Sequence, residues 1–167
     1  IMYRSAFWRQ GIIGMSAISG IDQALWDIKG KDLGKPVYEL LGGPVRDKAR
    51  MYTHFGGATP EAAAADAVSK VEKGWTAIKT VPMPPTNVID GPEIVRQSAE
   101  KLRAVREAVG DNIDILLDFH GRVTPQMAIL YGKAFEPYQP FFIEEPVQAE
   151  NPAAMAQVTR ALSTPIA

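Results

Sequence analysis

The feature that most constrains this chain is a regular alternation of short apolar segments with helical segments from residue 51 onward. Each short segment is apolar almost throughout, which is typical of parallel strands that are buried on both faces. We expect four strand–helix pairs and the beginning of a fifth strand. The expected strands are residues 51–55, 77–81, 113–119 and 141–143, followed by the truncated fifth at 164–167.

The helices between these strands have recognisable starts. Thr59-Pro60, Thr124-Pro125 and Asn151-Pro152 each place a capping side chain before a proline at the first helical position. A further helix is expected at residues 92–109, because its apolar residues share one face and Gly110 follows it. This pattern predicts an α/β fold, with a parallel sheet covered by helices.

Two architectures fit the alternation: an open doubly wound sheet and a (β/α)₈ barrel. The first strand–helix turn, residues 55–58, lacks the glycine spacing that binds dinucleotide phosphates, and no P-loop pattern occurs. This argues against a nucleotide-binding sheet. A complete barrel takes about 250 residues, so four units and a fifth strand are roughly half of one.

The first part of the chain shows a helical pattern in place of the strand–helix alternation. Apolar residues recur there at steps of three and four, which predicts a helix that Gly30 and Gly34 should end. A short helical piece, 37–41, follows. We expect a domain boundary near residue 47, with 1–47 as one domain and 48–167 as a partial barrel. The recurring residues are Ile18, Ile21, Leu25 and Ile28.

Composition excludes several classes of function. The formal net charge is −1, so bulk charge favours neither nucleic acid nor an anionic membrane as a partner. No apolar run is long enough to span a bilayer. The chain has no cysteine, which excludes disulfides and thiolate sites and is compatible with a reducing cytoplasm.

The third expected strand ends in the polar residues Asp118 and His120. These residues are two apart, so their side chains project from the same strand face, at the end of a strand where barrel enzymes carry catalytic groups. A carboxylate and an imidazole so placed could bind a metal and transfer a proton. The alternative is that Asp118 only caps the next helix and His120 is a surface residue.

The fourth strand repeats this arrangement and ends in Glu144-Glu145. Asp118 and Glu144 could meet across a cation, and oxygen ligands favour a hard ion such as Mg²⁺. Alternatively, the glutamates could serve only the dipole of the next helix. Lys79 ends the second strand and could bind a substrate carboxylate or simply extend to solvent. For His54, at the end of the first strand, a structural or substrate-lining role is favoured over catalysis.

The sequence resembles the mandelate racemase and muconate-lactonizing enzyme relatives of the enolase superfamily. The resemblance covers essentially the whole chain and is closest to the sugar-acid dehydratases of that family. Residues 16–30 are similar to the helix before the barrel, and Leu40-Leu41-Gly42-Gly43 follows as it does there. Asp118-Phe119-His120-Gly121-Arg122 and Phe142-Ile143-Glu144-Glu145-Pro146 are similar to the first two metal-ligand strands.

The resemblance implies a galactonate-like substrate and a 2-keto-3-deoxy product. Asp118 and Glu144 would be two of three Mg²⁺ ligands and His120 the general acid for the departing hydroxyl. From its strand-end position, Lys79 is a further candidate catalytic residue. The ion would stabilise an enediolate formed when the α-proton leaves. The partner would be a small acid sugar, and family habit implies a homo-oligomer. Residues 1–47 would be the helical part of an α+β capping domain.

Two departures from the family pattern matter. The third ligand and the later histidine base would lie past Ala167, so we expect a fragment that is inactive alone. Many relatives have a second lysine where this chain has Val81, and a valine cannot move a proton. A dehydratase is therefore favoured over a racemase, epimerase or lactonizing enzyme of the same fold. The remaining alternative is a non-catalytic half-barrel.

Overall fold

The computed structural model describes residues 2–5 and 11–167 and contains two compact units, Ile1–Ala49 and Arg50–Ala167. We call them the N-terminal unit and the C-terminal unit. The domain boundary expected near residue 47 stays a prediction. Among the described residues, no helix combines the length and the apolarity needed to cross a lipid bilayer.

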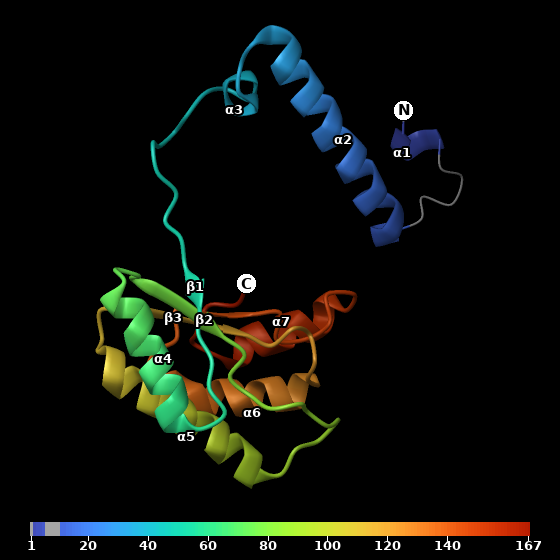
Figure 1. Ribbon diagram of the computed structural model, residues 1–167. Coiled ribbons are helices and arrows are strands. Elements are labelled where there is room, and N and C mark those ends of the chain that lie inside the picture. Colours follow the sequence, from blue (N-terminus) through green and yellow to red (C-terminus); the bar gives the residue numbers. More distant parts are fainter. Residues whose placement is uncertain (1, 6–10) are drawn as a thin grey trace. The chain divides into compact units, whose positions relative to one another are not determined.

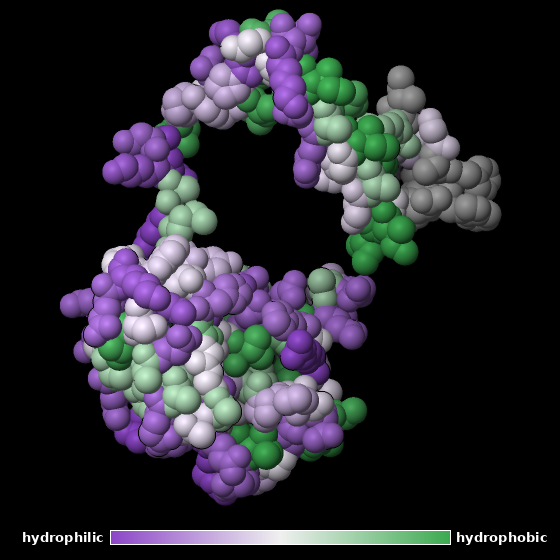
Figure 2. Space-filling view, viewed as in Figure 1, coloured by the Kyte–Doolittle hydropathy of each residue, from purple (hydrophilic) through white to green (hydrophobic). Residues whose placement is uncertain are grey.

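Helices are the only regular secondary structure among the described residues of the N-terminal unit. It contains α1 (Met2–Ser5), α2 (Gly11–Leu33) and α3 (Val37–Leu40). The periodicity predicted α2, but its apolar side chains are not covered within the unit: Ile21, Leu25 and Ile28 are all more than half exposed. Figure 2 shows hydrophobic residues at the surface along this helix.

The end of α2 agrees with the sequence expectation at one of its two glycines. Gly30 and Gly34 were both expected to end the helix, and α2 continues through Gly30 to Leu33. Gly34 then adopts a positive φ of 62°, its N–H donates to the carbonyl of Lys31, and the N–H of Lys35 donates to the carbonyl of Gly30. These paired bonds form a Schellman cap, so Gly34 is the terminator. Gly30 has a packing role, because a Cβ there would lie 2.8 Å from the Lys35 carbonyl oxygen.

The C-terminal unit alternates strands and helices as the sequence predicted (Figure 1). Its four strands are parallel and lie in the order β1-β2-β3-β4, which confirms the α/β class with a parallel sheet. The elements are β1 (Thr53–His54), α4 (Pro60–Glu72), β2 (Ala77–Thr80), α5 (Pro92–Val109), β3 (Asp114–Asp118), α6 (Pro125–Phe135), the 3₁₀ turn η1 (Glu136–Tyr138), β4 (Phe142–Glu144) and α7 (Pro152–Ala161).

The predicted helix starts are correct. The side chains of Thr59, Thr124 and Asn151 each accept a hydrogen bond from the backbone N–H three residues later. Each bond satisfies a donor that the helix itself leaves unpaired, and the proline that follows has no N–H to satisfy. These caps fix where the chain turns from a strand-end loop into a helix.

Side chains alternate between the two faces of the sheet. One face packs against the helices, which lie together on that side of the strands (Figure 1), and its side chains are fully buried. Burying each such side chain contributes about 1.5–3 kcal/mol. This helix-covered face carries Ile78, Ile115, Leu117 and Ile143. The opposite face carries, at the carboxyl ends of three strands, Lys79, Asp118 and Glu144.

The two edges of the sheet are less regular. The first strand was predicted over 51–55 but is limited to Thr53–His54, because only these two residues pair with β2, and Met51 is exposed. At the other edge, Ile166 forms a parallel bridge with Ile143, and the Ala167 N–H donates to the Ile143 carbonyl at 2.9 Å. The predicted beginning of a fifth parallel strand is therefore present.

Candidate active site at the strand ends

Three charged side chains converge at the carboxyl ends of β2, β3 and β4. Asp118 lies directly opposite Glu144 in the register of β3 and β4. Lys79 lies opposite Leu116, two residues before Asp118 on the same face of β3, and its long side chain extends toward the strand ends. The sheet therefore brings together Asp118, Glu144 and Lys79, which the sequence had singled out separately.

The Lys79 ammonium bridges the two carboxylates. Its Nζ lies 2.8 Å from Oδ2 of Asp118 and 2.5 Å from Oε2 of Glu144. Only 6% of the Lys79 side chain and 8% of the Asp118 side chain are exposed, whereas 31% of Glu144 is. Lys79 therefore does not extend to solvent. The Tyr52 ring, with its centroid 5.4 Å from Nζ, adds a cation–π contact that sequence reasoning missed.

These contacts shift the ionisation of both groups. Burial lowers the pKa of Lys79, but hydrogen bonds and charge attraction from the Asp118 and Glu144 carboxylates outweigh burial and raise it well above its ordinary value. Burial raises the pKa of Asp118, but the hydrogen bonds from Lys79 and from the His120 backbone outweigh it and lower that pKa. Lys79 is therefore held as a cation and Asp118 as an anion.

His120 lies at the solvent side of this cluster. Its Nε2 is 3.1 Å from Oδ2 of Asp118, and its backbone N–H donates to Oδ1 of the same carboxylate at 2.9 Å. The residue has a positive φ of 54°, and 41% of its side chain is exposed. Asp118 therefore holds both the backbone and the ring of His120. It does not cap α6, since Thr124 does so, and that alternative interpretation of Asp118 is wrong.

Glu144 and Glu145 have different environments. Glu144 contacts Lys79, whereas Glu145 has a positive φ of 44° and an exposed side chain. The first turn of α7 contains no acidic residue, so neither glutamate serves the dipole of that helix. The backbone carbonyl of Glu145 accepts a hydrogen bond from the Gly121 N–H at 2.8 Å, which ties the loops after β3 and β4 together beside His120.

The donor chemistry suits a hard cation. Asp118 and Glu144 offer carboxylate oxygens from neighbouring strands, and they already share one positive group, the Lys79 ammonium. Within residues 2–5 and 11–167, however, no group of three His, Cys, Asp or Glu side chains is arranged to hold a metal ion. Two ligands of a divalent cation fit the described residues, and the rest of its coordination shell would come from water, substrate or other protein groups.

The other candidate positions are less informative. His54 is exposed, with its ring centroid 6.0 Å from that of Tyr52, and makes no described contact with the carboxylates. Val81 packs against the hydrophobic core just after β2. A cavity of about 410 Å³ lies between the loops after β2, β3 and β4 and is lined by Asn87, Arg122, Thr124, Gln148 and Asn151, among others.

Comparison with known proteins gives consistent matches. Residues 62–167 match the family described as "Enolase C-terminal domain-like". Residues 1–42 match "Mandelate racemase / muconate lactonizing enzyme, N-terminal domain". Proteins named D-galactonate dehydratase from Variovorax paradoxus and Pectobacterium atrosepticum are each 46% identical, over 99% and 100% of this chain. The chain spans 44% of the length of each of those relatives.

Solved structures of the same superfamily superimpose on this chain. A member of the enolase superfamily from Salmonella Typhimurium superimposes with a TM-score of 0.91 at 36% identity, over 99% of this chain and 48% of that one. A mandelate racemase/muconate lactonizing enzyme-like protein from Roseovarius sp. TM1035 gives 0.91 at 37% identity, over 99% and 46%. The chain therefore corresponds to about half of each of these larger proteins.

Proposed function

This chain belongs to the mandelate racemase/muconate lactonizing enzyme family of the enolase superfamily, and on that premise we propose that it is part of a sugar-acid dehydratase. The substrate would be a galactonate-like aldonate, and loss of water would give a 2-keto-3-deoxy acid. The relatives named D-galactonate dehydratase support this reaction class. The observation that carries the proposal is the arrangement around Asp118. This carboxylate contacts the His120 ring, and it shares the Lys79 ammonium with Glu144.

Asp118 and Glu144 are the proposed Mg²⁺ ligands. They are paired across β3 and β4, and their oxygens suit a hard ion. The bound ion would supply Lewis-acid stabilisation of the negative charge that develops on the substrate carboxylate when the α-proton leaves. A third ligand and the α-proton base are expected from parts of the longer relatives that this chain does not span.

His120 is the proposed general acid. Its ring is held by Asp118 through Nε2 and is accessible from solvent, so it can approach a substrate bound over the strand ends. We propose that it donates a proton to the β-hydroxyl, which leaves as water. Lys79 is the proposed contact for the substrate carboxylate, since it is the buried cation among the described residues of this cluster.

Other properties of the whole protein stay predictions. A homo-oligomer and a cytoplasmic location are expected, with a small acid sugar as the partner. A racemase or epimerase is the alternative within the family. It is disfavoured because Val81, at the position of the second lysine in many relatives, cannot act as an acid or base.

The test is a screen of acid sugars with the full-length protein and Mg²⁺, in which formation of 2-keto-3-deoxy acids is measured. We expect a substrate whose turnover stops with EDTA and falls at least about 100-fold in His120→Asn, the usual scale of general acid catalysis. Metal binding should persist in that variant. Undiminished turnover in His120→Asn would remove His120 from the mechanism, and exchange of the α-proton without dehydration would indicate a racemase or epimerase instead.

A further inference from the structure

Lys79 occupies the place that the proposed function assigns to a metal ion. Its ammonium lies within 2.8 Å of an oxygen of Asp118 and within 2.5 Å of an oxygen of Glu144. Its side chain is almost fully buried, and so is that of Asp118. The same two carboxylates therefore already have a positive partner supplied by the chain itself.

An internal cation has a clear physical reason at this position. Two carboxylates that face each other on neighbouring strands repel one another, and burying them without a counter-charge is costly. In the protein without a metal ion, the Lys79 ammonium offsets both the repulsion between the carboxylates and the unfavourable free energy of burying them. A divalent cation between the same oxygens would remove them too, but the two positive groups cannot share that space, since like charges a few ångströms apart repel strongly.

We propose that Lys79 is an exchangeable counter-ion that bridges Asp118 and Glu144 in the metal-free protein and is displaced when a divalent cation binds. The inference rests on the proposed metal role of the two carboxylates. The Tyr52 ring already contacts the ammonium in the bridged position, with its centroid 5.4 Å from Nζ, and a shift toward this ring would keep a favourable partner for the displaced charge. Lysine suits this exchange because its ammonium is a compact charge on a flexible stem.

The exchange has a measurable consequence: the metal ion must compete with Lys79, so the lysine weakens metal binding. The first test is titration of the full-length protein with Mn²⁺, followed by electron paramagnetic resonance. Lys79→Met removes the charge and keeps an unbranched side chain, and we expect it to bind Mn²⁺ about tenfold more tightly or better. Lys70→Met is the matched control, because Lys70 pairs with Asp66 in α4, outside this cluster. Its Mn²⁺ affinity should equal that of the original protein.

The outcomes separate the two proposals. Equal or weaker Mn²⁺ binding by Lys79→Met, when the original protein binds Mn²⁺, would overturn the exchange and leave the metal site intact. If the original protein binds no Mn²⁺, the proposed metal role of Asp118 and Glu144 fails, and the exchange fails with it. Loss of Mn²⁺ binding in Asp118→Asn, with binding retained in Lys79→Met, would support the metal role of Asp118 separately from the exchange.

A second measurement avoids the risk that Lys79→Met fails to fold. Crystal structures of the unsubstituted full-length protein with and without Mn²⁺ should show the Lys79 Nζ within hydrogen-bond distance of both carboxylates only in the metal-free form. An ammonium that keeps both contacts beside bound Mn²⁺ would overturn the exchange. A metal-free form in which Lys79 does not bridge Asp118 and Glu144 would also overturn the exchange.

Discussion

The two units use apolar residues in opposite ways. In the C-terminal unit, the apolar faces of strands and helices are buried against one another, and Ile78, Ile115 and Leu117 have no exposed surface. In the N-terminal unit, α2 has a regular apolar face, but Ile21 and Leu25 are about half exposed. The same sequence pattern therefore describes a buried core in one unit and, in the other, a face that its own unit does not cover.

The units also differ in buried charge. Among the described residues, every buried charged side chain lies in the C-terminal unit: Lys79, Asp90, Arg106 and Asp118. Each has specific partners, so these charges are tolerated where a compact core surrounds them.

Periodicity predicts which residues form a face, but only tertiary packing determines whether that face is covered. Mutations in matched positions can test this contrast.

The largest effect is expected in the core of the C-terminal unit. Leu117→Ala in the 167-residue chain should lower the free energy of unfolding by about 3–5 kcal/mol, because it leaves a cavity between β3 and the helices. The measurement is urea denaturation followed by circular dichroism. A loss below about 1 kcal/mol would mean that this core is loosely packed, and the contrast between the units would disappear.

A buried arginine should give the next largest effect. Arg106 in α5 donates hydrogen bonds to four backbone carbonyls, those of Gly110, Ile113, Tyr138 and Gln139. Arg106→Met should cost about 2–3 kcal/mol of unfolding free energy, since four bonds to a charged donor are lost, one of them buried and three partly buried.

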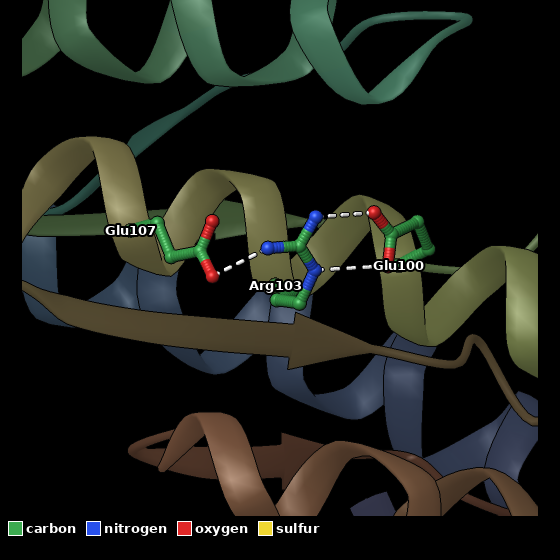
Figure 3. Close-up of polar contacts among 3 residues, drawn as sticks. All are labelled: Glu100, Arg103 and Glu107. Carbon is green, nitrogen blue, oxygen red and sulfur yellow. Dashed lines mark hydrogen bonds and ion pairs between the residues drawn. The ribbon is translucent and has the colours of Figure 1, made fainter.

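The same helix supplies the control. Arg103 pairs with Glu100 and Glu107 on the exposed side of α5 (Figure 3). Because solvent screens such pairs, Arg103→Met should not change the denaturation midpoint measurably. Equal losses in the two variants would show that the backbone contacts of Arg106 contribute little.

A smaller effect is expected from one buried hydroxyl. The Tyr131 hydroxyl in α6 donates to Oδ2 of Asp90 at 3.0 Å, and Oδ1 of Asp90 accepts from the backbone and side chain of Asn87. Tyr131→Phe should cost about 1–2 kcal/mol, because it leaves a buried carboxylate with one donor fewer. Thermal unfolding would measure this, and an unchanged midpoint would contradict it.

The acid side of the stability profile should depend on Asp118. Its pKa in the folded chain is lowered, so its contribution to stability is present above its unfolded value of about 3.9 and is lost as pH falls through the folded value. The free energy of unfolding should therefore decline below about pH 4. In Asp118→Asn, the free energy of unfolding should decline less steeply over the same range. Parallel acid profiles for the two proteins, measured by urea denaturation at pH 2–6, would contradict this assignment.

The smallest effect is expected in α2. Leu25→Ala in the 167-residue chain should change the unfolding free energy by less than about 0.5 kcal/mol, because Leu25 is already exposed. The matched comparison is Leu117→Ala under the same conditions. A loss of similar size for both would mean that the apolar face of α2 is covered in solution, for example by self-association, which would show as a dependence on protein concentration.

Much of the fold followed from local signals. The caps at Thr59, Thr124 and Asn151 and the bounds of α5 were predicted because each depends on a few neighbouring residues. The end of α2 was correctly predicted at Gly34, but Gly30 was wrongly included, because a glycine signals both flexibility and close packing. Only the contact with the Lys35 carbonyl distinguishes these two roles.

The candidate site was predicted as residues and not as an arrangement. Strand-end position and alternation placed Asp118 and Glu144 together, and the register confirms that pairing. The bridge by Lys79 could not be predicted, because it depends on how far β2 is staggered against β3 and on the reach of a flexible side chain. The contact with Tyr52 is equally dependent on tertiary structure. The catalytic and metal-binding roles stay predictions.

The order of the strands also bears on how this unit is made. Because β1, β2, β3 and β4 are neighbours in the sheet in the same order as in the chain, each strand pairs with the one synthesised just before it. Within residues 50–167, each strand from β2 onward therefore has its pairing partner already synthesised when it leaves the ribosome. Lys79 is translated before both of its carboxylate partners, so the counter-charge of Asp118 and Glu144 precedes them in the order of synthesis.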